Sequence, residues 1–268
     1  LGFTVKQSML IYTALLLLLH NLLFYALLRR QSVTTLTAVA LVCLWSFLFM
    51  ALQCPWLYAW DMLDIIIFTL TSYIIVYNKD SRLLLALFPL ALLNRETALF
   101  LPLGYVIVEI ARHTALANTR LPRLNGPSWA RIIFGVFLIF CGAAYTSLVR
   151  DWLFIESSWG GQDIGNPLLI GNQSHLLVQI KSFTFNNFRN GNIIHTALMW
   201  LSVIYMLALA RRSNSTGIYA GAMFFLAFWL GIFFFGVINE TRLFFPTLSL
   251  AIFLVVSQLN KNSLRRLV

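Results

Sequence analysis

Seven long apolar runs dominate this chain of 268 residues and constrain its fold more than any other feature. Each run approaches the roughly 20 mostly apolar residues that a helix needs to cross a bilayer. Most lack the polar face that a surface helix of a water-soluble bundle would show. They therefore predict an all-α, polytopic transmembrane helical bundle with about seven full spans. The runs lie at 9–28, 33–52, 61–77, 132–149, 193–210, 217–236 and 242–258.

Composition excludes several other classes of protein. Only 10% of the residues are charged, against about 25% in a typical soluble domain. A transmembrane β-barrel would show short alternating segments instead of continuous apolar runs. The net charge of +10 does not indicate nucleic-acid binding, because the basic residues form small groups at the ends of apolar runs.

The segment 83–111 is interrupted by polar residues in the stretch "LLNRETALFLP" (92–102), which holds Asn94, Arg95, Glu96 and Thr97. Ionisable groups at membrane depth are costly unless they are paired or hydrated, so they often mark functional sites. We expect two short helices, about 83–93 and 97–111, that form a hairpin with these residues at its tip. A structural role is the alternative, with Asn94 as the N-cap of the second helix.

The basic residues predict the orientation of the chain. Placing the groups that follow the first, third and fifth full runs, the hairpin and the last run in the cytoplasm satisfies the positive-inside rule. It also requires the hairpin to enter and leave on the same side. These groups hold 13 of the 19 basic residues: Arg29, Arg30, Lys79, Arg82, Arg112, Arg120, Arg123, Arg131, Arg211, Arg212, Lys261, Arg265 and Arg266.

This orientation collects most acidic residues on the opposite, non-cytoplasmic face. The external loop 150–192 also lies there, with His175 as a candidate ligand contact and an amphipathic pattern at 175–188 that predicts an interfacial helix. We expect a single transmembrane domain over 1–268. Seven of the nine acidic residues are on this face: Asp61, Asp64, Glu96, Asp151, Glu156, Asp163 and Glu240.

Two aspartates open the third run in "YAWDMLDIIIF". Asp61 and Asp64 are three residues apart and therefore share one face of a helix. Asp61 is also explained by a favourable contact with the positive helix N-terminus. Asp64 lies one turn deeper, where it is a candidate general base or metal ligand. No motif requires a cofactor. A divalent cation bound at these carboxylates stays an open alternative.

A second external turn repeats the residue types of the hairpin tip, with Asn239, Glu240 and Arg242 in "GVINETRLFFP" (236–246). Arg95 can pair with Glu240, and Glu96 with Arg242, which would tie the hairpin to the last span. Alternatively, the two arginines can hold a phosphate or pyrophosphate, which suits the guanidinium fork. The sequence leaves both interpretations open.

The stretches 60–109 and 235–250, with their RET tip and E-x-R-x-F-x-P-like turn, resemble bacterial glycosyltransferases of the GT-C type. The resemblance covers about residues 55–255. It implies an integral membrane enzyme that uses a polyprenyl-phosphate-linked sugar on the non-cytoplasmic face. Such enzymes generally carry an acidic catalytic residue in the loop after their first span, so we expect a further span and loop before Leu1.

The leading hypothesis is therefore a glycosyltransferase in a bacterial inner (plasma) membrane. Asp64 or Glu96 would be the catalytic base, and Asp61, Asn94, Arg95, Asn239, Glu240, Arg242 and His175 would contact the substrates. Its partners would be membrane lipid, the polyprenyl-phosphate-linked donor and other membrane proteins, with no nucleic acid. The alternatives are an inert GT-C-like subunit of a larger membrane assembly and a transporter of lipid-linked glycans or solutes. A transporter would favour paired repeats, which we do not find.

Overall fold

The computed structural model describes residues 5–52, 59–94, 96–116, 126–154, 193–213, 215–235 and 245–265. Within these ranges every regular element is a helix, which confirms the all-α prediction for the part described. The elements are α1 (Val5–Arg29), α2 (Thr35–Leu52), α3 (Ala59–Val76), α4 (Arg82–Asn94), the 3-10 helix η1 (Glu96–Leu99), α5 (Phe100–Leu116), α6 (Gly126–Phe154), α9 (Ile193–Arg212), α10 (Thr216–Phe235) and α11 (Phe245–Arg265).

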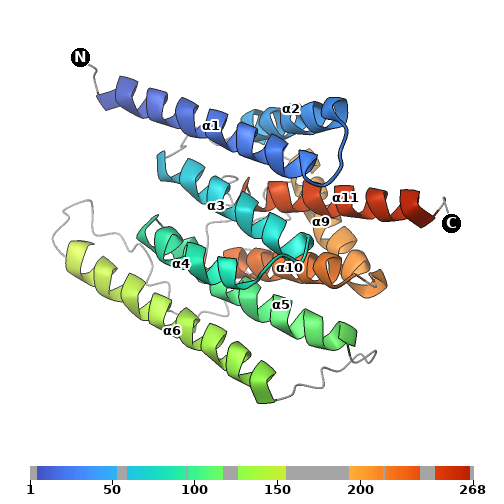
Figure 1. Ribbon diagram of the computed structural model, residues 1–268. Coiled ribbons are helices and arrows are strands. Elements are labelled where there is room, and N and C mark those ends of the chain that lie inside the picture. Colours follow the sequence, from blue (N-terminus) through green and yellow to red (C-terminus); the bar gives the residue numbers. More distant parts are fainter. Residues whose placement is uncertain are drawn as a thin grey trace.

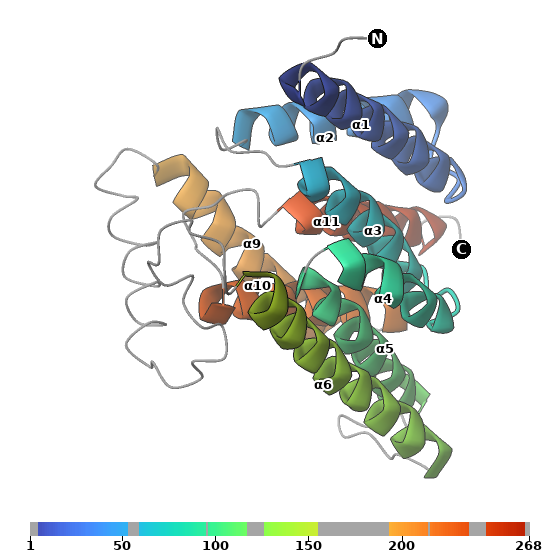
Figure 2. The same ribbon diagram turned by 90° about the vertical axis from the view of Figure 1, so that its left-hand side faces the viewer.

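Helix α3 lies at the centre of the arrangement (Figure 1). It contacts α1 on one side, α4 and α5 on another, and α10 and α11 on a third. The turned view in Figure 2 shows α1 and α2 together above α3 and α11, while α6 lies on the opposite, lower side next to α5. Side chains of α3 are accordingly buried along almost its whole length.

The predicted hairpin is confirmed. Helix α4 ends at Asn94, η1 begins at Glu96, and α5 begins at Phe100, so the polar stretch interrupts the helix where the sequence indicated. Asn94 is the last residue of α4, and η1 lies between it and α5, so the alternative that it caps the second helix stays a prediction.

One boundary also differs from the prediction. Helix α6 continues to Phe154, so residues 150–154 are helical and do not belong to the external loop. The apolar periodicity ends near Val149, but backbone hydrogen bonding carries the helix through one further turn. The interfacial helix expected at 175–188 lies outside the described residues.

Among the described residues, two helical segments are both long and apolar enough to cross a membrane, Gln7–Arg29 and Trp129–Val149. Four further apolar segments are shorter: Thr35–Met50, Arg82–Asn94, Thr216–Ile232 and Phe245–Leu259. All seven apolar runs therefore coincide with helices, whereas the prediction of about seven full spans goes beyond what helix length and composition establish.

Aromatic side chains fill the contacts between α3 and its neighbours. Phe68 of α3 meets Phe228 of α10 edge to face, with ring centroids 5.1 Å apart. Tyr73, one and a half turns further along α3, meets Phe253 of α11 in the same way at 5.9 Å. Such edge-to-face pairs add about 0.5–1.5 kcal/mol each beyond the area that they bury.

Buried polar side chains join three helices inside this apolar core. Nε2 of His20 in α1 lies 3.0 Å from Oγ1 of Thr69 in α3, and the same oxygen lies 2.7 Å from Oγ of Ser249 in α11. All three residues are fully buried. Because each would lose its partner if a helix shifted, these contacts fix the register of α1, α3 and α11.

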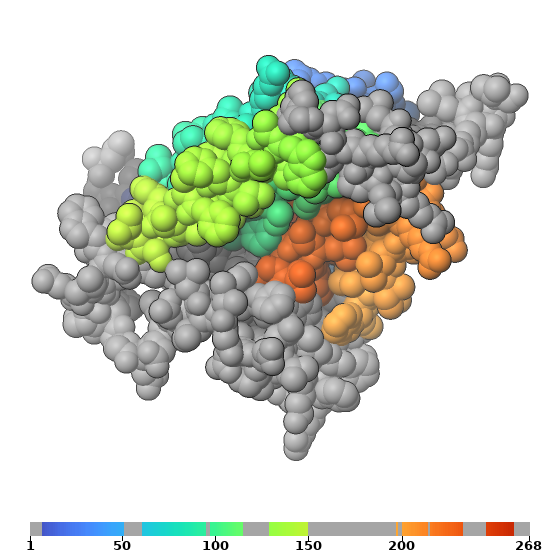
Figure 3. All heavy atoms as spheres, turned by 90° about the horizontal axis from the view of Figure 1, so that it is seen from below, coloured from blue at the N-terminus to red at the C-terminus, as the bar shows by residue number. Residues whose placement is uncertain are grey.

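Helix α6 lies on the outside of the bundle, where it packs against α5 and η1 and spreads over one face in the space-filling view (Figure 3). Two glycines permit this packing. A Cβ at Gly135 would lie 2.5 Å from Cγ2 of Val106, and a Cβ at Gly142 would lie 2.6 Å from a methyl group of Leu99. Small residues at such contacts let two helices approach closely.

Candidate functional site

The two aspartates of α3 occupy its first and second turns. Asp61 lies in the first turn, where its negative charge is favoured by the positive end of the helix. Both carboxylates are buried, with Asp61 3% and Asp64 2% exposed. Burial at this level removes a carboxylate from water, so its environment is set by protein groups.

The hairpin tip reaches Asp64 directly. Oγ1 of Thr97, in η1, donates a hydrogen bond of 2.8 Å to Oδ1 of Asp64. The sequence placed both residues on the same face of the protein, and the structure brings them into contact. A carboxylate held by a hydroxyl in a buried position has a fixed orientation, which is what a general base requires.

The other predicted residues are placed less completely. Asn94 is half-buried at the end of α4, and Glu96 is the first residue of η1, so both belong to the same hairpin tip. Arg95, His175, Asn239, Glu240 and Arg242 lie outside the described residues. The proposed pairing of the hairpin tip with the second external turn is therefore untested.

The described residues contain no group of three or more His, Cys, Asp or Glu side chains that could hold a metal ion. Asp61 and Asp64 supply two carboxylates of such a set. A cation bound by these two carboxylates would need further oxygen ligands.

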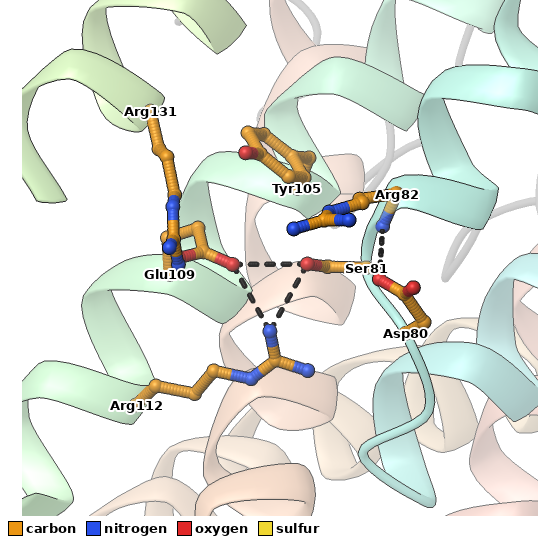
Figure 4. Close-up of a pocket in the computed structure, with 7 residues that line it drawn as sticks. All are labelled: Asp80, Ser81, Arg82, Tyr105, Glu109, Arg112 and Arg131. Carbon is orange, nitrogen blue, oxygen red and sulfur yellow. Dashed lines mark hydrogen bonds and ion pairs between the residues drawn. The ribbon is translucent and has the colours of Figure 1, made fainter. Parts of the chain in front are cut away.

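A second polar site, which the sequence analysis did not identify, lies at the opposite ends of α4 and α5 (Figure 4). Its centre is Glu109 of α5, a carboxylate that is only 1% exposed. The surrounding cavity has a volume of about 220 Å³. Its lining residues are Asp80, Ser81, Arg82, Tyr105, Glu109, Arg112 and Arg131.

Both carboxylate oxygens of Glu109 are bound. Oε1 accepts hydrogen bonds from Oγ of Ser81 at 2.9 Å and from Nη1 of Arg112 at 3.0 Å. Oε2 accepts one from Nη1 of Arg131 at 3.2 Å, across the contact between α5 and α6. A buried charge is tolerated when it is paired and hydrogen-bonded in this way.

Arg112 joins this carboxylate to the turn between α3 and α4. Its Nε donates to Oδ1 of Asn78 at 3.1 Å, and its Nη2 donates to the carbonyl oxygen of Lys79 at 2.9 Å. The end of α5 is thereby fixed to the start of α4, which closes the hairpin at its basic end. Asn78 has a positive φ of 49°, a conformation that asparagine tolerates better than most residues.

The sequence did contain a signal for this second site. Glu109 and Arg112 are three residues apart and therefore adjacent on a helix, and Glu109 is one of two acidic residues that the orientation places at the basic end. An isolated carboxylate among arginines is a natural ion-pair centre. The contribution of Arg131 depends on how α6 packs, which no local pattern reveals.

Comparisons with protein-family models, with curated protein sequences and with solved structures give no match to this chain. The family resemblance therefore rests on the sequence motifs alone, and the geometry described above must carry the functional argument.

Proposed function

We propose that this chain is an integral membrane protein. In each of the two longest apolar segments, Gln7–Arg29 and Trp129–Val149, only 17% of the most apolar window is buried inside the protein. A core helix of a soluble protein would be mostly buried, so these helices need an apolar environment on their outer faces. A signal sequence would account for the first segment but not for the second, in the middle of the chain.

The orientation follows from the distribution of charge along the helices. The C-terminal ends of α1, α3 and α5 and the N-terminal ends of α4 and α6 lie at one end of the bundle (Figure 1). Arg29, Arg82, Arg112 and Arg131 belong to these ends. The positive-inside rule assigns this basic end to the cytoplasm, and Asp61, Asp64 and the hairpin tip to the non-cytoplasmic face.

On that face we propose a glycosyltransferase of the GT-C type that takes its sugar from a polyprenyl-phosphate donor. The observation that carries this proposal is the 2.8 Å hydrogen bond from Thr97 to Asp64. It supports a common site because it joins the hairpin tip, which holds Asn94 and Glu96, to the acidic start of α3. Asp64 or Glu96 would accept the proton of the acceptor hydroxyl.

The donor needs a cationic contact for its phosphate, because negative charge develops on the leaving group. Arg95 at the hairpin tip and Arg242 in the second external turn are the candidates in this proposal. Asp61, Asn94, Asn239, Glu240 and His175 would bind the sugar or the acceptor. A divalent cation bridging phosphate and carboxylate is compatible with the same site.

The test is sugar transfer by the purified protein in liposomes that contain polyprenyl-phosphate-linked sugars. A missing general base typically costs 10²–10⁴-fold in rate, so one of the two variants Asp64→Asn and Glu96→Gln is expected to lower transfer by at least about 100-fold. Asp80→Asn, an exposed aspartate at the basic end, is the matched control and should retain transfer. Full transfer by both Asp64→Asn and Glu96→Gln would contradict the proposal. A loss of transfer supports the proposal only in a variant that unfolds at the wild-type temperature.

The second candidate is an inert subunit on the same scaffold. The hydrogen bond from Thr97 to Asp64 also fits this candidate, because it can hold a buried carboxylate in a purely structural role. In that case no donor is turned over, and a stoichiometric membrane partner accompanies the protein on native gels. Transfer without any partner would exclude this candidate.

A further inference from the structure

The cavity at the basic end has more positive charge than its carboxylates neutralise. It is lined by the guanidinium groups of Arg82, Arg112 and Arg131 and by the carboxylates of Asp80 and Glu109. One positive charge is therefore left over at neutral pH. Because both oxygens of Glu109 are already bound, this carboxylate has little capacity for a further cation.

Arg82 supplies the group that is available to a ligand. Its side chain forms no hydrogen bond or ion pair with any residue that the structure describes, and Figure 4 shows its guanidinium group pointing into the cavity beside Tyr105. Arg131 is bound to Glu109 through Nη1 only, and its side chain is 52% exposed. Two guanidinium groups at this cavity therefore retain N–H donors that no residue in the described ranges accepts.

The space suits a small anionic group. The cavity volume of about 220 Å³ greatly exceeds the roughly 10–15 Å³ that one buried water needs, so a tetrahedral anion with bound water fits. Guanidinium groups bind phosphate oxygens through paired hydrogen bonds, and basic pockets between helices on the cytoplasmic side are suited to phosphate-bearing headgroups.

We propose that this cavity is a phosphate-binding site in which Arg82 and Arg131 bind the phosphate. The ion pair between Arg112 and Glu109 holds α5 against the start of α4 and so keeps the cavity in shape. The source of the phosphate is an anionic lipid headgroup or a free phosphate in the cytoplasm. The site lies at the opposite end of α4 and α5 from Asp64, so it does not depend on the proposed transferase activity.

Native mass spectrometry of the detergent-purified protein tests the proposal, with phosphatidylglycerol, inorganic phosphate and zwitterionic phosphatidylcholine as probes. We expect saturable binding of phosphatidylglycerol or phosphate above the level of phosphatidylcholine. Arg82→Gln should weaken it about fivefold, since one arginine near a membrane surface contributes about that factor. Arg82→Lys, which keeps the charge but not the fork, should lie between the two.

The lipid and the free anion are distinguished by competition. If inorganic phosphate displaces phosphatidylglycerol, the site recognises the phosphate group alone; if only the lipid binds, its headgroup is the ligand. Arg212→Gln, at the exposed end of α9 and outside the cavity, is the matched control and should bind as wild type. Arg131→Gln provides a second variant from a different helix if Arg82→Gln folds poorly.

Equal binding of both anionic probes by the wild type, Arg82→Gln and Arg131→Gln would overturn the proposal. An equal loss in Arg212→Gln would overturn it as well, because the effect would then reflect total charge instead of this cavity. Wild-type binding of phosphatidylglycerol no stronger than that of phosphatidylcholine, together with no binding of phosphate, would have the same meaning.

Discussion

At the scale of single residues, Glu109 is a buried carboxylate that depends on its hydrogen-bond partners. Its side chain is 2% exposed, and it accepts hydrogen bonds from three residues on three segments of the chain. Burying a carboxylate costs several kcal/mol, which only well-placed partners offset. Removing the carboxylate therefore differs greatly from removing one of its exposed partners.

We expect Glu109→Gln to destabilise the protein by about 3 kcal/mol, because Arg112 would remain beside a neutral group that cannot balance its charge. Arg131→Gln should cost no more than about 1 kcal/mol, since the Arg131 side chain is 52% exposed and water can replace its contact. Unfolding in detergent micelles titrated with sodium dodecyl sulfate measures both. Equal losses would show that Arg131, not burial, determines the strength of this cluster.

The two sites show what sequence can predict about single residues. Asp61, Asp64 and Thr97 were assigned to one face because charges in an apolar run must face water or a partner. The direct contact of Thr97 with Asp64 was not predicted, since it depends on the tilt of the hairpin against α3. The role of Glu109 is not predictable from its position alone, because most charged residues near it in the sequence are basic and its partner Arg131 comes from another helix.

At the scale of helices, close contacts between backbones decide the arrangement. Gly217, at the start of α10, lies against the carbonyl group of Val76 at the end of α3, and a Cβ there would overlap that backbone. Gly104 of α5 faces side chains instead, with a Cβ position 3.1 Å from Cε2 of Phe224. A side chain can rotate away from an added methyl group, whereas a helical carbonyl cannot.

Gly217→Ala should therefore destabilise the protein by about 1–3 kcal/mol, the usual cost of overpacking. Gly104→Ala should cost less, because the gain of up to about 1 kcal/mol in helix propensity offsets a contact that can relax. The same denaturation assay compares them. A larger effect at Gly104 than at Gly217 would contradict the close approach of α10 to α3.

The elements themselves were largely predictable from periodicity and composition. Every apolar run became a helix, and the polar stretch at 94–97 correctly indicated the break between α4 and α5. The details at the break were not predictable. A 3-10 helix separates α4 from α5, and η1 also packs against α6, a contact that no local sequence pattern reveals.

At the scale of the whole molecule, the exposed apolar surface tests the membrane assignment. Cys43 of α2 and Cys141 of α6 are free and exposed on that surface, each among apolar neighbours. In a bilayer, lipid would cover both thiols, and a charged maleimide could not reach them. In water, the same maleimide would reach both exposed thiols.

In native membranes from a Cys54→Ser variant, we expect neither Cys43 nor Cys141 to react with a membrane-impermeant maleimide, even after the membranes are opened. Both should react once the protein is unfolded in sodium dodecyl sulfate. A cysteine introduced as Ser213→Cys, just after α9, should react only when the cytoplasmic side is accessible. Rapid labelling of Cys43 and Cys141 in sealed membranes would refute the assignment.

If the chain spans a membrane as proposed, the unequal lengths of its helices have a consequence for the depth of the site. The outer helices α1 and α6 have 25 and 29 residues, whereas α3 has 18 and α4 only 13. At 1.5 Å per residue, α4 measures about 20 Å, so in the proposed orientation it would fall about 10 Å short of a 30 Å hydrocarbon layer.

Figure 1 shows α1 and α6 extending past α3 and α4 at the acidic end. In a membrane, Asp64 and the hairpin tip would therefore lie below the level of the lipid headgroups, flanked by two taller helices. A donor whose sugar is carried on a long isoprenoid chain could then reach them sideways from within the leaflet. It would not have to lift its tail out of the hydrocarbon to do so.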